Sequence, residues 1–333
     1  MPELTPEEVW NLNKKQLLKL LESGAFTPQS KETHFYAPSF TYYKTKLYRS
    51  TPNSFPTVSV TGASCALNCK HCGGKVLETM HPATTAKQLF DVCSKLKRDG
   101  AVGCLVSGGC LPDGSVPLGG FVETLGKVKR ELGLTVFVHT GIIDLETAVA
   151  LKRAGVDAAL IDVIGSDEAI KKALNLNVSP SSYADSLLAL EKSGLTFVPH
   201  VIVGLNEGRL SGEFVALKMI TAVKPAALVI IAFMPIHGTA MEKTPPPKPE
   251  DIAKVALTAR LMFPHTPLIL GCMRPKGAAR GETDVLALKA GVDAVAFPSE
   301  EAVKYAEGRG CRNVFSSYCC AQMYLDAGRK TEN

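Results

Sequence analysis

Long apolar runs are missing from the 333-residue chain, and no apolar signal-peptide core lies near its first residues. We therefore expect a soluble, cytoplasmic protein with no membrane partner. Dense blocks of lysine and arginine are also missing, although the net charge is +5. Such blocks follow the phosphate backbone in nucleic-acid-binding proteins, so the sequence does not indicate a nucleic-acid partner.

Cysteines, by contrast, are abundant: the chain has ten, unevenly spaced, and 46% of its residues are hydrophobic. A disulfide framework is typical of small secreted domains that cannot build a sufficient core, and a chain of this length can build one. We therefore interpret the cysteines as metal or redox groups in a reducing compartment.

From Phe55 onward, short apolar runs alternate with amphipathic helical stretches. Most of the runs are continuously apolar, as expected for parallel strands that helices cover. Eight strand–helix units predict an α/β fold, a single (β/α)8 TIM-type barrel with active residues at the C-terminal ends of its strands. The predicted strands are Thr57–Thr61, Val102–Ser107, Thr135–His139, Ala158–Val163, Thr196–Val203, Ala227–Phe233, Pro267–Gly271 and Val292–Phe297.

The chain divides into three expected parts. Residues 1–54 should form an N-terminal extension that packs against the barrel, and residues 1–15 within it a short amphipathic helix. Residues 55–300 should form the barrel itself, and residues 301–333 a C-terminal segment that carries further cysteines.

A cysteine trio, Cys65-Ala-Leu-Asn-Cys69-Lys-His-Cys72, directly follows the first predicted strand. Three thiolates on one loop can ligate three irons of a 4Fe–4S cluster and leave the fourth iron open to another ligand. A structural zinc site is the alternative, but such sites normally show a second pair at matching spacing, and none follows here. The trio Cys65, Cys69 and Cys72 therefore favours a redox-active cluster.

The trio, in this position, resembles the radical S-adenosylmethionine (SAM) superfamily, and the resemblance runs from about Thr57 to the C-terminus. It implies a barrel in which the open iron chelates SAM, and an electron from the cluster releases a 5′-deoxyadenosyl radical. That radical abstracts hydrogen from an unactivated carbon. The resemblance also implies contacts to SAM from His71, Ser107, Gly108, Gly109, Asp162, Val203 and Gly204.

Five of the remaining cysteines are candidates for a second cluster. Adjacent cysteines in a reducing compartment rarely serve packing alone, which gives Cys319 and Cys320 a metal or sulfur role. We hypothesise an auxiliary 4Fe–4S cluster held by the second cysteine group, Cys272, Cys319 and Cys320, with Cys110 or Cys311 as a further ligand. Arg274 could meet this cluster or the SAM carboxylate, although a solvated or helix-packing arginine is an equal alternative. Cys93 and Cys104 are interpreted as buried structural thiols.

The biotin synthase branch is similar along the chain, including the turn Pro235-Ile236-His237-Gly238-Thr239. Its auxiliary-cluster cysteines on the third and fifth strands are replaced by His139- and His200-containing strand ends. A closer resemblance is to the archaeal-type two-protein lipoyl synthases. It is carried by His34–Ser39, Cys65–Met80, Val138–Gly141, Asp162–Ser166, Gly271–Pro275 and Cys319-Cys320.

That resemblance implies a radical SAM sulfurtransferase that inserts sulfur into an octanoyl, or monothiolated octanoyl, chain. The chain would be carried by a lipoyl-carrier protein (H protein or E2 lipoyl domain), and the auxiliary cluster would donate the sulfur. An electron donor such as ferredoxin and a sister radical SAM protein are implied partners. The alternatives are another radical SAM enzyme of cofactor biosynthesis, biotin synthase-like or methyltransferase-type, and a non-catalytic iron–sulfur carrier. The strand-end residues His139, His200 and His237 are expected to be hydrogen-bonded structural groups.

Overall fold

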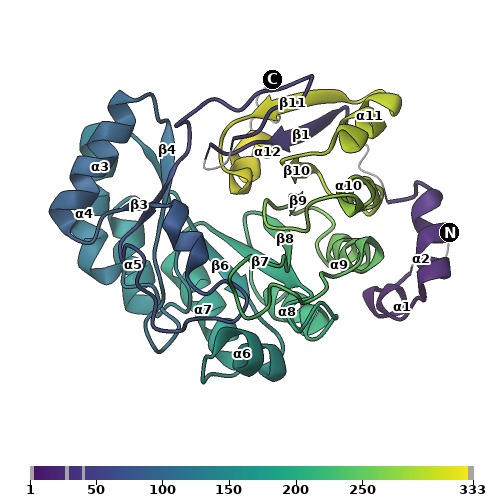
Figure 1. The fold of residues 1–333 in the computed structure, drawn as a ribbon, viewed down its shortest axis with the longest axis horizontal. Coiled ribbons are helices and arrows are strands. Elements are labelled where there is room, and N and C mark those ends of the chain that lie inside the picture. The colour runs from purple at the N-terminus through teal and green to yellow at the C-terminus, as the bar shows by residue number, and fades with distance from the viewer. Residues whose placement is uncertain (1–3, 27–29, 40–41, 329–333) are drawn as a thin grey trace.

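The computed structural model describes residues 4–26, 30–39 and 42–328. Its centre is an eleven-stranded sheet in which neighbouring strands run parallel throughout the described residues (Figure 1). All eight predicted strands are confirmed, several of them a few residues shorter than expected. They are β2 (Thr57–Ser59), β4 (Gly103–Ser107), β5 (Thr135–His139), β6 (Ala158–Val163), β7 (Phe197–Val203), β8 (Leu228–Ala232), β9 (Leu268–Leu270) and β10 (Ala294–Ala296).

Three further strands join the sheet: β1 (Glu32–Tyr36), β3 (His81–Pro82) and β11 (Arg312–Ser316). The order is β11-β1-β10-β9-β8-β7-β6-β5-β4-β2-β3, so β1 lies between β10 and β11 and pairs with both. The α/β TIM-type architecture is confirmed, with one correction. Within the described residues β3 and β11 are the two edges, and the sheet curls round without closing into a ring.

Helices cover the outer face of the sheet, as Figure 1 shows. They are α3 (Ala86–Arg98), α4 (Val122–Lys127), α5 (Leu145–Arg153), α6 (Asp167–Leu174), α7 (Pro180–Ser193), α8 (Glu213–Ile220), α9 (Pro249–Met262), α10 (Ala279–Lys289) and α11 (Glu300–Gly308). Among the described residues, none is both long enough and apolar enough to cross a bilayer.

The single helix expected over residues 1–15 is instead two short helices, α1 (Pro6–Trp10) and α2 (Lys14–Glu22), and residues 1–3 lie outside the described part. The break has a local cause. The Asn13 side chain accepts from the Gln16 backbone N–H and Gln16 caps Asn13 in return, which starts a new helix at Lys14.

The inner face of the curled sheet has its own apolar core. Side chains alternate along parallel strands, and the inward set includes Phe137, Leu160 and Val198. The segment from η4 (Cys320–Gln322) into α12 (Met323–Gly328) packs on these residues, on the inner side of the sheet (Figure 1). It reaches from β1 to β5, because the Tyr36 hydroxyl donates to Asp326 at 2.5 Å and the Tyr324 ring lies 6.3 Å from that of Phe137.

Candidate active site inside the curled sheet

The cysteine trio lies on the loop that follows β2, and the C-terminal end of α6 fixes the middle of this loop. Asn175, in the left-handed conformation just after α6, donates its side-chain amide to the backbone oxygens of Leu67 and Asn68 at 3.1 and 2.8 Å. The backbone N–H of Lys70 donates to the Ala173 oxygen at 2.8 Å. Because the loop is held by backbone contacts, its cysteines have defined positions before any metal binds.

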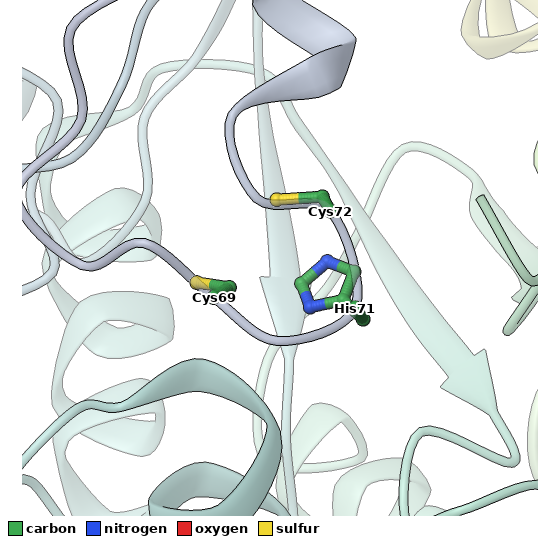
Figure 2. Close-up of side chains that lie close together, drawn as sticks. All are labelled: Cys69, His71 and Cys72. Atoms are coloured by element: carbon green, nitrogen blue, oxygen red, sulfur yellow. The ribbon is translucent and has the colours of Figure 1, made fainter. Parts of the chain in front are cut away.

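The ligand atoms of Cys69, His71 and Cys72 lie within 4.8 Å of one another, and Figure 2 shows them on one turn of the loop. The hydrogen bond between the two sulfurs, helped by His71, lowers the pKa of Cys72 to about 4, whereas it raises the pKa of Cys69. Burial lowers the pKa of His71, but the Cys72 sulfur and Asp162 together raise it by more, so the pKa of His71 lies above its ordinary value.

Cys65 lies outside that 4.8 Å group but close enough for its charge to raise the pKa of Cys69. Three soft sulfur donors on one fixed loop, one of them a thiolate at neutral pH, suit a thiophilic iron–sulfur cluster. The residues present therefore fit the 4Fe–4S cluster that the sequence predicts.

Gly109, at the end of β4, is where the sheet meets this loop. A Cβ atom on Gly109 would overlap the Ser64 oxygen and lie 2.6 Å from the Cys65 Cβ, so only glycine fits without a shift. Its backbone N–H donates to the Thr61 hydroxyl at 2.7 Å. On the same strand, the Ser107 hydroxyl donates to the His139 oxygen at 3.1 Å. Gly108 and Gly109 thus bring β4 against the trio.

The backbone that follows β7 is held by a buried carboxylate that the sequence did not predict as functional. Glu213, on the first turn of α8 and only 3% exposed, accepts from the backbone N–H of Gly204 at 2.8 Å and of Ser211 at 2.6 Å. Burial raises the pKa of this carboxyl above its ordinary value. The signal available in the sequence was an acidic residue at the start of a mainly apolar helix. The Val203 side chain is fully buried in the helix-facing core, so only its backbone could contact a cofactor.

Two cysteines considered for the second cluster lie elsewhere. The Cys110 oxygen accepts from the Ala66 backbone N–H at 2.9 Å, and burial, Cys65 and Asp162 raise the Cys110 pKa to about 12, which places this thiol beside the trio. The Cys311 sulfur lies 3.5 Å from the Ser30 oxygen, at the start of β11. The structure therefore does not bring Cys110 or Cys311 to the second cysteine group.

The second cysteine group itself is brought together. Cys272 follows β9 and Cys320 opens η4, and the side chains of Cys272 and Cys319 are each close enough to that of Cys320 to shift its pKa. The nearby Cys320 side chain, together with burial, raises the pKa of Cys272, and Cys320 also has a raised pKa. Cys320 belongs to the inner apolar core, and the other two pack against it.

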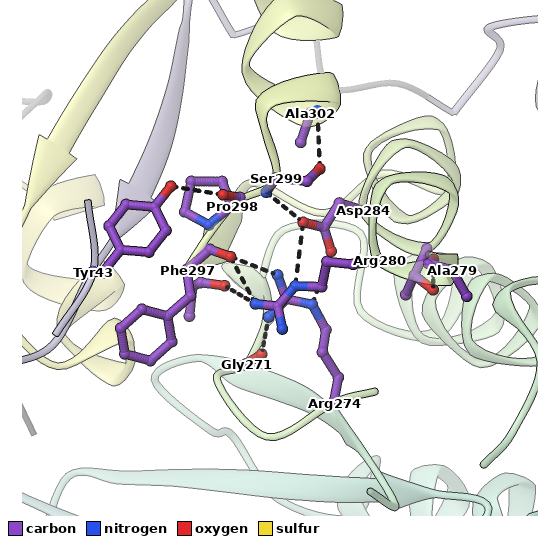
Figure 3. A network of polar contacts seen from close by, with 12 residues as sticks. Tyr43, Gly271, Arg274, Ala279, Arg280, Asp284, Phe297, Pro298, Ser299 and Ala302 are labelled. Atoms are coloured by element: carbon purple, nitrogen blue, oxygen red, sulfur yellow. Dashed lines mark hydrogen bonds and ion pairs between the residues drawn. The ribbon is translucent and has the colours of Figure 1, made fainter. Parts of the chain in front are cut away.

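Arg274 is the centre of the polar network in Figure 3 and is completely buried. Its Nε lies 2.8 Å from Asp284, and its two terminal nitrogens donate to the backbone oxygens of Gly271 at 2.5 Å and Phe297 at 3.3 Å. Arg280 also donates to the Phe297 oxygen, at 2.6 Å. Arg274 therefore fixes the turn that precedes Cys272, and its charge favours the ionised form of Cys272 and Cys320.

Two histidines to which the sequence assigned only structural roles face the interior beside Asp162. Asp162 on β6 is the register partner of His200 on β7, and the His139 Nε2 on β5 lies 3.5 Å from Asp162 Oδ1. Burial lowers the pKa of His200 to about 4. Burial also acts to raise the Asp162 pKa, but the two histidines lower it below its usual range. His237, by contrast, is fully exposed.

Comparison with known proteins finds relatives that match the part of the chain containing the trio loop. Residues 59–209 match the model of the radical SAM superfamily, a span that contains the trio, Gly109, Asp162 and Gly204. The chain is 28% identical over 251 residues to the biotin synthase of Rickettsia felis, covering 72% of this chain and 78% of that protein. It is 26% identical over 257 residues to the biotin synthase of Prochlorococcus marinus (strain NATL2A), covering 72% and 70%.

Two solved structures share the fold. The crystal structure of methylornithine synthase (PylB) superposes with a TM-score of 0.61 at 17% identity, covering 93% of this chain and 94% of that one. The structure of HydG, a maturase of the [FeFe]-hydrogenase, gives a TM-score of 0.61 at 16% identity, covering 97% and 74%.

Proposed function

We propose that this chain, which is similar to the radical SAM superfamily over residues 59–209 and to biotin synthases, inserts sulfur at an unactivated carbon of a saturated chain. A 4Fe–4S cluster held by the trio, with SAM bound, supplies a carbon-centred radical that removes hydrogen from such a carbon. Saturated C–H bonds offer no acidity to a general base. The protein's own side chains therefore have to orient the substrate and exclude water.

The observation that supports this proposal is the position of the second cysteine group on the inner side of the sheet, where other side chains connect it to the trio loop. A line of neighbouring side chains joins the two. His71 on the trio loop interacts electrostatically with Asp162, Asp162 with His139, and His139 with Cys272. A substrate lying along this line meets the radical source at one end and sulfur at the other.

In this proposal Cys272, Cys319 and Cys320 hold an auxiliary iron–sulfur cluster that donates the sulfur. Sulfur ligands suit such a cluster, and the Arg274 guanidinium offsets part of the negative charge of the thiolates. Arg274 also fixes Gly271, so Cys272 leaves β9 in a set direction.

The proposed substrate is an octanoyl, or monothiolated octanoyl, chain on a lipoyl-carrier protein. Its support is the lipoyl synthase resemblance carried by Cys65–Met80, Gly271–Pro275 and Cys319-Cys320. An electron donor such as ferredoxin and a sister radical SAM protein belong to the same proposal.

A second candidate is sulfur insertion into the sulfur-free precursor of biotin, favoured by the curated relatives, which are biotin synthases. Against it, β5 and β7 have His139 and His200 where the resemblance to biotin synthases leads us to expect auxiliary-cluster cysteines. The two candidates share the reaction type and differ in the substrate.

Anaerobic incubation with dithionite and SAM tests both candidates. One arm receives an octanoyl-lysyl peptide, another the monothiolated peptide, and a third the biotin precursor. Mass spectrometry then follows deoxyadenosine and sulfur addition separately. We expect sulfur on a lysyl peptide. Sulfur only on the biotin precursor would replace the first candidate with the second, and deoxyadenosine without sulfur in any arm would reject sulfur insertion.

Matched variants separate the two cysteine groups. The Cys319→Ala/Cys320→Ala variant should still cleave SAM but add no sulfur, and its iron content should fall from about eight to about four per chain if both clusters are cubanes. Cys311→Ser is the control, because this cysteine lies outside both groups, and it should behave as the wild type. An unchanged iron count in the double variant would contradict the auxiliary cluster.

A further inference from the structure

His139, Asp162 and His200 form a second cluster of metal-ligating side chains, separate in its chemistry from the cysteines. One ligand atom from each lies within 4.8 Å of the other two. They come from the adjacent strands β5, β6 and β7, and Asp162 and His200 are direct register partners. Because the three strands are parallel and paired, the backbone fixes this convergence.

Two atoms of the cluster are buried and have no hydrogen-bond partner: Asp162 Oδ1 and His200 Nδ1. His200 is only 8% exposed, so an unsatisfied ring nitrogen is costly there. Asp162 Oδ1 does lie 3.5 Å from His139 Nε2, which is ion-pair distance but does not satisfy hydrogen-bond geometry. Both atoms can donate a lone pair, so a metal ion could satisfy them.

The sheet fixes the position of His200. Its backbone pairs with Asp162 of β6 on one side and with Val229 of β8 on the other. The strand register therefore sets where its ring, with the orphaned Nδ1, enters the interior.

We propose that His139, Asp162 and His200 bind a divalent first-row transition-metal ion on the inner face of the sheet. Two imidazoles and one carboxylate form a donor set of nitrogen and oxygen that suits Fe²⁺, Mn²⁺ or Zn²⁺ and differs from the all-sulfur sets of the cysteine groups.

Such an ion has room for further ligands. The side chains of His139 and Asp162 are 26% and 36% exposed, so the open side of the cluster faces accessible space inside the sheet. The ion would lie between His71 and Cys272, where it could coordinate a carbonyl or carboxylate of a bound substrate. This site does not depend on the sulfur-insertion proposal.

Zinc binding to the full-length, anaerobically reconstituted protein tests the site. After dialysis against zinc chloride, elemental analysis measures zinc and iron per chain in the same sample. X-ray absorption at the zinc edge then identifies the atoms that ligate the zinc. We expect about one zinc per chain with a first shell of nitrogen and oxygen near 2.0–2.1 Å and imidazole scattering beyond it. No bound zinc, or zinc with a sulfur shell only, overturns the proposal.

The variant His139→Gln/His200→Gln should lose this zinc while keeping its iron and its affinity for SAM. His265→Gln is the matched control, because this exposed histidine lies between α9 and β9, and it should retain the zinc. If the double variant does not fold, His139→Gln alone should bind zinc at least tenfold more weakly. Zinc binding that both His139 variants leave unchanged refutes the site.

Discussion

Replacing Gly109 with alanine should displace the loop that carries the cysteine trio. The added Cβ would overlap the Ser64 oxygen and lie 2.6 Å from the Cys65 Cβ and 2.7 Å from the Cys65 Cα. Gly109 does not have a positive φ, so alanine can adopt its backbone conformation and the contact alone is tested. Because the atoms that it meets belong to or adjoin backbone, rotation of a side chain cannot relieve the overlap.

Overpacking of this kind costs about 1–3 kcal/mol. If the cost falls on the position of the loop, the population that can hold the cluster decreases roughly 5- to 150-fold, since each 1.4 kcal/mol is a factor of ten. We therefore expect Gly109→Ala to lose iron and to form deoxyadenosine from SAM more slowly by a factor within that range.

Two neighbouring glycines provide graded controls. A Cβ at Gly108 would meet the Thr61 and Val60 side chains at 3.0–3.2 Å, so Gly108→Ala should have an intermediate effect. A Cβ at Gly120 would meet no atom within 4 Å, so Gly120→Ala should match the wild type. If Gly109→Ala keeps its iron and cleaves SAM as fast as Gly120→Ala does, the loop does not depend on this contact and our reasoning is refuted.

Three further predictions follow from the same structure. Arg274→Leu should lower the free energy of unfolding by about 3–5 kcal/mol in urea titrations. It removes the nearer of the two arginines that pair with the buried Asp284 and leaves only Arg280, at 3.7 Å. Arg209→Leu, at an exposed position, should change this free energy by less than about 0.5 kcal/mol. Cys110→Ser should keep the iron of the auxiliary cluster, and Cys272→Ser should lose it; equal iron loss in both would contradict the placement of Cys110. Burial raises the pKa of Tyr43 from 10.0 to about 12, so the folded state keeps a proton that the unfolded chain loses. Stability should therefore fall as the pH rises from 10 to 12, and Tyr43→Phe should show a smaller fall in its urea midpoint over that window.

Much of the barrel could be predicted from the sequence because its strands are continuous apolar runs with helices between them. The three strands that the sequence did not predict, β1, β3 and β11, depend on long-range pairing or are very short. β11 pairs with β1, and β1 pairs with β10 on its other side. The pairing of β1 with β11 joins residues 280 positions apart, which no local periodicity encodes. β3 has only two residues, too few for a pattern.

The candidate site, too, could be predicted from the sequence only in part. The sequence predicts that Asp162 and His139 lie near strand ends, but His200 lies in the middle of β7. Which side chains come close together depends on the register of three strands. The register puts His200 on the inner face and Val203 on the outer one. Arg274 lies in a loop whose sequence resembles an exposed turn, and only its partner Asp284, ten residues later, explains its burial.

The position of β1 in the sheet affects the order in which parts of the fold can form during synthesis. Residues 312–316 pair only with residues 32–36 among the described strands, and this ladder leads directly to Cys319 and Cys320. During synthesis the trio and the strands around it emerge long before that ladder can form, so the second cysteine group is assembled last. Deleting residues 32–36 at the other end of the sequence should therefore release Cys319 and Cys320 from the sheet.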